Sequence, residues 1–257
     1  MQLHYQIQGH HQAQPLLFLH GLFGSADNWG TIAKHFAQHY QVITVDLRNH
    51  GRSPHSDSQT FPEMAADVAE TLDALGIGRV HLIGHSLGGK VAMQFASLYA
   101  ERVHTLTVVD MATRAYADAH THLMDAMQAL NLQQLPSRQA VDQALSAQIP
   151  SLMVRQFLLT NLVKHEEQFQ WRIPLSALKA NYSHFQAALA AQSSRPTLII
   201  RGARSDYVRE SDIADMQQQF TQATFVTLPT DHWVHAEQPQ LFIQAIEDFF
   251  SGLNHQG

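Results

Sequence analysis

Cysteine is absent from the 257-residue sequence. Its absence excludes disulfide bonds, a thiolate nucleophile and metal sites built on cysteine ligands. Basic residues are also few, since 16 Lys and Arg stand against 22 Asp and Glu and give a formal net charge of −6. The chain therefore lacks the basic surface that binds nucleic acid or anionic membranes. We expect no nucleic-acid partner and no stable membrane association.

Long hydrophobic runs are absent as well. The densest apolar stretch, LLFLHGLF (residues 16–23), is too short to span a bilayer. The first residues, MQLHYQIQGH, lack the basic n-region and apolar segment of a signal peptide. These features predict a cytoplasmic protein. The 18 histidines include no HExxH spacing, so we expect no metal site.

What the sequence does contain is an alternation of short apolar runs with amphipathic helical segments. The composition, 45% hydrophobic and 15% charged, is that of a globular protein. Continuous Val/Ile/Leu runs separated by helices predict an α/β fold, with a mostly parallel sheet covered by helices on both faces. The predicted strands are residues 16–20, 42–46, 80–84, 103–110, 196–202 and 224–229, and the predicted helices are residues 25–38, 64–76, 86–100, 209–220 and 238–250.

The segment 111–195 interrupts this alternation. It is rich in Gln, Ala, Leu and His, and stretches such as LMDAMQAL and VRQFLLTNLV are typical of helices, with no strong strand signal. We predict a core domain of residues 1–110 and 196–257, with a helical insertion over residues 111–195.

The stretch GHSLGG (residues 84–89) follows the apolar run VHLI and opens a helix. G-x-S-x-G alone is a weak motif, but strand, sharp turn and helix form the context of a nucleophile elbow. Gly84 and Gly88 fit a turn that leaves no room for a Cβ atom. We predict that Ser86 is a nucleophile, exposed at the carboxyl edge of the sheet.

A serine hydroxyl needs a base, and in this fold the chain order is serine, acid, histidine. His232 lies in LPTDHWVHAEQP, after the last strand, and is favoured over His235, which is closer to the closing helix. Asp110 and Asp206 each follow a strand and are both candidates for the acid. An oxyanion hole would use two backbone amides. That of Leu87 follows the serine, and that of Leu22 lies in the early loop HGLFGS.

The segments LFLHGLFGSADNW, VDLRNHGRSPH, LIGHSLGGKVAM and DHWVHAEQPQLF together resemble the α/β-hydrolase superfamily. The combination of HGLFGS, DLRNHGRS and GHSLGGK is most similar to the small bacterial carboxylesterases of the YbfF type. The resemblance implies hydrolysis of carboxylic esters or acyl thioesters, without a cofactor, under a helical cap formed by residues 111–195.

The resemblance also bears on the acid. In the YbfF-like group the acid is expected at the end of the strand TLTVVD, which favours Asp110 over Asp206. Ser205, which stands where many superfamily members have the acid, would then support the triad. Asp231 precedes His232 at a position where many relatives have glycine.

Other functions on this fold stay open at this point. Serine at the elbow disfavours epoxide hydrolases and haloalkane dehalogenases, which use aspartate there. Serine-based C–C bond hydrolases or lyases remain an alternative, and a basic residue in the pocket would favour them. A ligand receptor with the hydrolase fold is a further alternative. The candidate basic residues are Arg114, Arg155 and Arg172, and the expected pocket residues are Phe23, Met111, Tyr116 and Tyr207.

Overall fold

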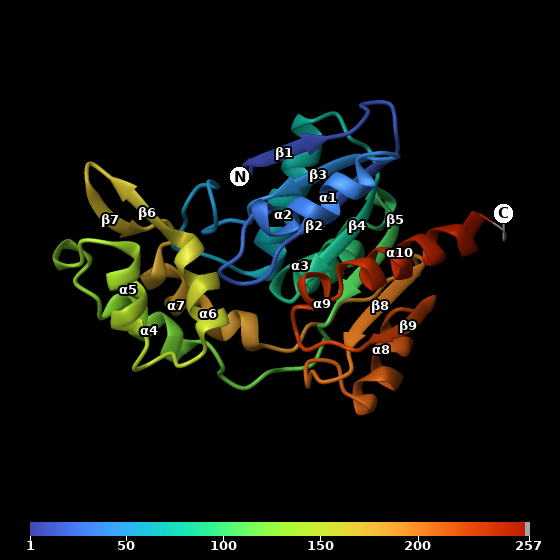
Figure 1. Cartoon of the computed structure of the whole chain (residues 1–257). Coiled ribbons are helices and arrows are strands. Elements are labelled where there is room, and N and C mark those ends of the chain that lie inside the picture. The colour runs from blue at the N-terminus through green and yellow to red at the C-terminus, as the bar shows by residue number, and fades with distance from the viewer. Residues whose placement is uncertain (255–257) are drawn as a thin grey trace.

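The six predicted strands and one further strand form a seven-stranded sheet in the computed structural model, which describes residues 1–254 (Figure 1). All neighbouring strands are parallel except β1, which runs antiparallel to β3 at one edge. The sequence analysis had not predicted β1. In their order across the sheet, the strands are β1 (Tyr5–Gln8), β3 (Gln41–Val45), β2 (Pro15–Leu19), β4 (Val80–His85), β5 (Val103–Val109), β8 (Thr197–Gly202) and β9 (Ala223–Leu228).

Helices cover both faces of this sheet. Successive side chains of a strand point to opposite faces. On β2, Leu17 and Leu19 pack in the cluster that contains α2 and α3, whereas Leu16 and Phe18 pack with α1 and α10. The predicted α/β fold with helices on both faces is therefore confirmed. The helices of this part are α1 (Gly30–Phe36), α2 (Phe61–Ala74), α3 (Leu87–Leu98), α8 (Ile213–Gln219), α9 (Val234–Glu237) and α10 (Pro239–Asn254).

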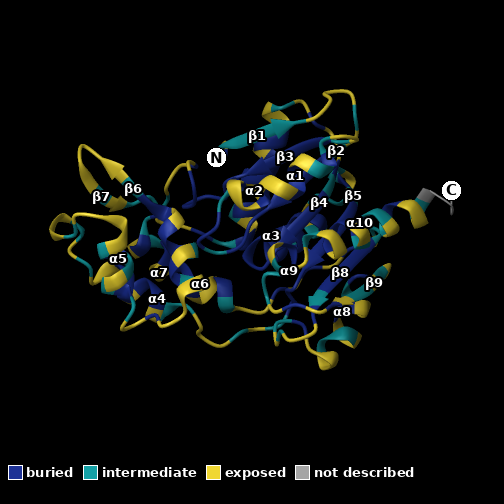
Figure 2. Ribbon diagram, viewed as in Figure 1, coloured by how far each residue is buried: buried dark blue, intermediate teal, exposed yellow. Residues whose placement is uncertain are grey.

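Residues 111–195, here termed the inserted segment, leave the sheet after β5 and return at β8. Figure 1 shows them as a separate group of elements beside the sheet, coloured green to gold. Figure 2 shows the sheet strands largely buried and much of the outer surface of this group exposed. The group consists of α4 (Thr121–Gln128), α5 (Arg138–Leu145), α6 (Leu152–Leu158), β6 (Leu162–His165), β7 (Gln168–Trp171) and α7 (Leu175–Gln186).

The inserted segment is not purely helical, contrary to the sequence-based expectation. β6 and β7 form an antiparallel hairpin. Its turn uses Glu166 and Glu167, both with positive φ (46° and 68°), where Asn or Gly would be the usual signal of a two-residue turn. Because those residues are missing and the strands are largely polar, the hairpin left no recognisable pattern. Within residues 1–254, no helix is long and apolar enough to cross a membrane.

Candidate active site

Ser86 lies on a sharp turn between β4 and α3, as the elbow motif predicts. Its backbone is left-handed (φ 54°), a conformation that a non-glycine residue rarely adopts. A Cβ atom on Gly84 would lie 2.2 Å from the carbonyl oxygen of Gly88. One on Gly88 would lie 2.5 Å from the carbonyl oxygens of Leu19 and His20. Both glycines are thus required by close backbone approach, and the turn holds the Ser86 hydroxyl at the carboxyl edge of the sheet.

The structure brings Ser86, His232 and Asp110 into one hydrogen-bonded chain. His232 Nε2 lies 2.9 Å from Ser86 Oγ, and His232 Nδ1 lies 2.7 Å from Asp110 Oδ2. Since a carboxylate only accepts, Nδ1–H donates to Asp110 and Nε2 is free to accept the serine proton. These contacts join residues 146 and 122 positions apart in the chain.

Asp110 is fully buried at the end of β5, with its backbone also left-handed (φ 49°). Its Oδ1 accepts the Gly202 amide at 3.0 Å, and its Oδ2 accepts the Ser205 hydroxyl at 2.5 Å as well as His232. Ser205 is therefore placed where it can hold the carboxylate in position. The other candidate acid, Asp206, is exposed and makes no hydrogen bond to His232 among the described residues.

His235 is not part of this chain of contacts. It is buried, with its ring stacked on Trp29 at a centroid distance of 4.3 Å. Burial lowers its pKa to about 3, and the neighbouring His232 adds to the effect. A neutral ring packed on an aromatic side chain fits a structural role. The preference for His232 over His235 thus agrees with the geometry.

Two aromatic groups fix the orientation of His232. The Tyr207 ring stacks on the imidazole with a centroid distance of 3.7 Å and an interplanar angle of 17°. His85 Nε2–H donates to the His232 carbonyl oxygen at 2.9 Å. Asp231, by contrast, points away, because its carboxylate pairs with Arg204 at 3.3 Å and is more than half exposed. The extra carboxylate beside His232 is thus neutralised by a surface cation.

The loop after β2 brings Leu22 to the cavity beside Ser86. Leu22 lines the space around Ser86, and a Cβ atom on Gly21 would lie 3.2 Å from Ser86 Cβ. Neither the Leu22 nor the Leu87 amide donates to another group in the part of the chain that the structure describes. These two amides are available to a substrate oxygen, as an oxyanion hole requires.

His20 and Asn161 hold this loop in place. His20 Nδ1–H donates to the Gly21 carbonyl at 2.8 Å, and its Nε2 accepts the Leu47 amide at 2.9 Å. Burial lowers the pKa of His20, so the ring stays neutral and can accept that bond. Asn161, from the inserted segment, donates to the Phe23 carbonyl at 2.8 Å, where the Phe23 backbone has a φ of 63°.

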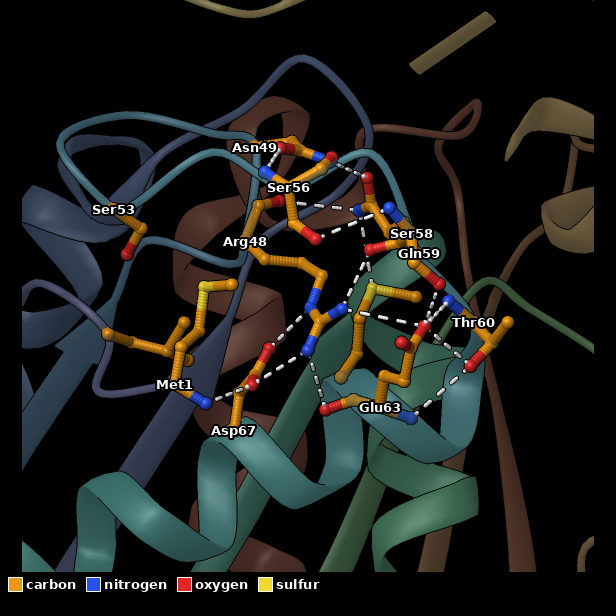
Figure 3. A network of polar contacts seen from close by, with 12 residues as sticks. Met1, Arg48, Asn49, Ser53, Ser56, Ser58, Gln59, Thr60, Glu63 and Asp67 are labelled. Carbon is orange, nitrogen blue, oxygen red and sulfur yellow. Dashed lines mark hydrogen bonds and ion pairs between the residues drawn. The ribbon is translucent and has the colours of Figure 1, made fainter. Parts of the chain in front are cut away.

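A buried polar network holds the segment after β3, whose Leu47 amide donates to His20. Sequence analysis had missed this network. The stretch LRNHGRSPHSD (residues 47–57) has the composition of a polar turn-rich loop, which gives no sign of buried contacts. Arg48 is buried and forms a two-pronged contact with Asp67 of α2, with Nε–Oδ2 at 2.6 Å and Nη2–Oδ1 at 2.8 Å (Figure 3). Asp46 accepts the amides of Ala26 and Arg52 at 2.7 and 2.8 Å. These contacts fix the segment that donates to His20.

Two cavities meet at Ser86. The larger lobe, of about 420 Å³, lies toward His232 and includes Phe23. The smaller lobe, of about 230 Å³, lies toward α3 and includes Met111 and Tyr116. The four expected pocket residues are thus all found at the site, with Tyr207 in both lobes. The residues shared by the two lobes are Leu22, Ser86, Ala119, His120 and Tyr207.

The basic residues considered for a carboxylate-bearing substrate are engaged elsewhere or distant. Arg114 lines the smaller lobe, but it pairs with Asp212 at 3.1 Å and donates to the Asp206 carbonyl at 2.7 Å. Arg155 pairs with Asp142 at 2.9 Å. Arg155 and Arg172 line neither lobe among the described residues. Lys90 and Arg209 are the other basic residues of the smaller lobe, and the Lys90 ammonium donates to three backbone carbonyl oxygens. The three arginines considered from the sequence therefore give no support to a C–C bond hydrolase.

Lys90, four residues after Ser86, is a buried cation that sequence analysis did not single out. Its Nζ donates to the carbonyl oxygens of Arg114, Phe185 and Ala187 at 3.2, 3.2 and 2.5 Å. Burial lowers its pKa to about 8. Arg114 precedes α4, Phe185 lies in the last turn of α7 and Ala187 follows that helix. Lys90 therefore connects both ends of the inserted segment to α3.

Comparison with known proteins agrees with this geometry. Residues 14–143 match the family model described as "alpha/beta hydrolase fold". The chain is 34% identical to the esterase YbfF of Escherichia coli, over 95% of this chain and 96% of that protein. It is 38% identical to an sn-1-specific diacylglycerol lipase, ABHD11, of Danio rerio, over 94% of this chain and 80% of that one. A solved structure described as a marine microorganism esterase aligns with a TM-score of 0.94 at 33% identity, covering 97% of this chain and 99% of that one.

Proposed function

The chain belongs to the α/β-hydrolase family, and we propose that it hydrolyses carboxylic esters through an acyl-enzyme formed on Ser86. One observation carries this proposal, namely the continuous hydrogen-bonded chain from Ser86 Oγ through His232 to Asp110. The relatives named as esterases and a lipase support ester hydrolysis as the reaction.

In the first half-reaction, His232 Nε2 takes the proton of Ser86 as Oγ attacks the ester carbonyl carbon. The resulting oxyanion accepts hydrogen bonds from the amides of Leu22 and Leu87. His232 then gives the proton to the alkoxy oxygen, and the alcohol leaves. In the second half-reaction a water molecule attacks the acyl-enzyme by the same route, and the carboxylic acid is released.

Asp110 stabilises the imidazolium that forms on His232 and keeps its tautomer correct. Its own two oxygens accept from Gly202, Ser205 and His232, so the buried carboxylate is held in one orientation. Ser205 acts through Asp110 and is a positioning residue.

Small-molecule esters are the substrates that the relatives' names indicate. Acyl thioesters are compatible with the same chemistry, because the leaving sulfur needs no different group at the site. We expect the inserted segment, residues 111–195, to act as a cap domain, since it supplies Ala119, His120 and Phe157 to the cavity. A cytoplasmic location without a nucleic-acid partner stays a prediction from composition.

The test is steady-state hydrolysis of p-nitrophenyl butyrate. We expect Ser86→Ala to abolish turnover and Asp110→Asn to lower kcat by about 10⁴-fold, because an amide stabilises the wrong tautomer of the histidine. Asp231→Asn is the matched control, since it removes a neighbouring carboxylate that faces solvent. Equal activity of Ser86→Ala and the unmodified protein would contradict the proposal.

A further inference from the structure

The two lobes at Ser86 are lined by different residues of the proposed catalytic machinery. His232 lines the larger lobe and does not line the smaller one. Leu87, which supplies an amide of the oxyanion hole, lines the smaller lobe and does not line the larger one. Ser86 and Leu22 line both. The reacting carbonyl carbon therefore lies at the junction, with a histidine side and an α3 side.

This asymmetry orients an ester, given the proposed acyl-transfer function on which this inference rests. His232 Nε2 must come within hydrogen-bond reach of the alkoxy oxygen in order to protonate it. The alkoxy group consequently leaves on the histidine side. The acyl carbon is bonded to Ser86 Oγ and its oxygen points to the Leu22 and Leu87 amides, so the acyl chain extends on the opposite side.

The larger lobe is suited to an uncharged, apolar group. Its walls include Leu123, Ile149, Val154, Phe157 and Trp233. None of the described residues that line it is Lys, Arg, Asp or Glu. A charged leaving group would be desolvated there without a partner, which is strongly unfavourable.

The smaller lobe limits chain length. Its volume is about 230 Å³, against about 420 Å³ for the larger lobe. Met111 and Phe185 are buried side chains in the wall of the smaller lobe, so an acyl chain that extends past them would need repacking. On its exposed side the smaller lobe is lined by Ala117, Asp206 and Arg209.

We propose that the larger lobe receives the alcohol part of the ester and the smaller lobe the acyl part. The preferred substrates are then esters of short- to medium-chain acids with larger, apolar, uncharged alcohols. Decyl acetate and ethyl decanoate test this directly, because they are isomers with the long chain on opposite sides of the ester. The purified full-length chain should show a kcat/KM about tenfold higher for decyl acetate, measured by titration of the released acid.

Two substitutions should shift this preference in opposite directions. Val154→Trp narrows the larger lobe from α6, and Ala117→Trp narrows the smaller lobe from an exposed position. We expect the ratio of kcat/KM for decyl acetate over ethyl decanoate to fall about tenfold in Val154→Trp and to rise about tenfold in Ala117→Trp. Met153→Trp is the matched control, because Met153 is 58% exposed on the same helix and lines neither lobe.

The outcomes separate the two proposals. If the unmodified protein hydrolyses neither p-nitrophenyl butyrate nor either of the two isomeric esters, the proposed function is wrong. If it hydrolyses p-nitrophenyl butyrate but the two tryptophan variants shift the ratio the other way, or shift it equally, the lobe assignment is wrong. Thermal unfolding identifies a variant that does not fold, and Gln186→Trp, which lines the smaller lobe, then replaces Ala117→Trp.

Discussion

Strained residues gather around the reacting group. Six non-glycine residues have positive φ in the described part of the chain, and three of them, Phe23, Ser86 and Asp110, are at the site. Each such conformation costs on the order of 1–3 kcal/mol and persists only where the surroundings enforce it. Here a hydrogen bond from Asn161 fixes Phe23, close glycine contacts fix Ser86, and Gly202 with Ser205 fixes Asp110.

At the residue scale, Gly88→Ala tests whether the elbow depends on close backbone approach. The new Cβ atom would lie 2.5 Å from two backbone oxygens that cannot move independently. We expect the free energy of unfolding to fall by about 1–3 kcal/mol, and esterase activity to fall with it because Ser86 shifts. Chemical denaturation and p-nitrophenyl butyrate hydrolysis measure the two effects. Gly30→Ala is the control, since a Cβ atom there has nothing within 4 Å, and an equal loss in both variants would refute the argument.

At the scale of elements, the inserted segment both walls the cavity and braces the oxyanion loop. The contact between Asn161 and the Phe23 carbonyl is made across 138 residues of sequence. Lys90 ties the two ends of the same segment to the helix that follows Ser86. The position of the inserted segment and the geometry of the oxyanion hole are therefore linked.

Asn161→Ala should accordingly impair catalysis, although Asn161 lines neither lobe of the cavity. Losing the bond frees the Phe23 carbonyl and lets the neighbouring Leu22 amide drift from the oxyanion. We expect kcat to fall about tenfold, equivalent to about 1.4 kcal/mol, with a smaller change in KM. Asn131→Ala, at an exposed position of the inserted segment, is the control. An unchanged kcat in Asn161→Ala would show that the loop holds its shape without this contact.

Sequence motifs and hydrophobic periodicity predicted the helices and strands better than the contacts between them. The elbow, the flanking strands and the covering helices follow from motifs and periodicity, and the fold is confirmed. The structure also brings Ser86, Asp110 and His232 together, and their catalytic roles stay predictions that the variants test. The choice of Asp110 rested on a family resemblance, because two carboxylates at the same sheet edge look alike in a sequence.

The missed features share a physical cause. The hairpin of β6 and β7 turns on two glutamates in a conformation that their residue type rarely adopts. The segment 47–57 is polar, yet Arg48 and Asn49 are buried, with Asp67 of α2 and Gln59 as their hydrogen-bond partners. The sequence shows that a side chain is polar, but it does not show which distant residue will form a hydrogen bond with that side chain in the folded protein.

At the scale of the whole molecule, buried neutral histidines set the response to acid. Burial lowers the pKa of both His50 and His235 to about 3, with a smaller contribution from a neighbouring histidine in each case. The pKa of His20 and that of His85 are also lowered by burial. In the unfolded chain a histidine titrates near pH 6.5, so below that pH the unfolded state binds protons that the folded state does not.

Stability should therefore fall as the pH falls from about 6.5 toward 3. Between pH 7 and pH 5, His50 and His235 should each remove about 2 kcal/mol from the free energy of unfolding. Urea unfolding at pH 7, 6 and 5 measures the slope, and His235→Phe, which keeps a ring against Trp29, should lose about 2 kcal/mol less over that interval. His10→Phe, at an exposed position, should leave the slope unchanged. A slope in His235→Phe equal to that of the unmodified protein would mean that His235 binds protons equally in the folded and the unfolded state, which would refute the lowered pKa of the buried ring.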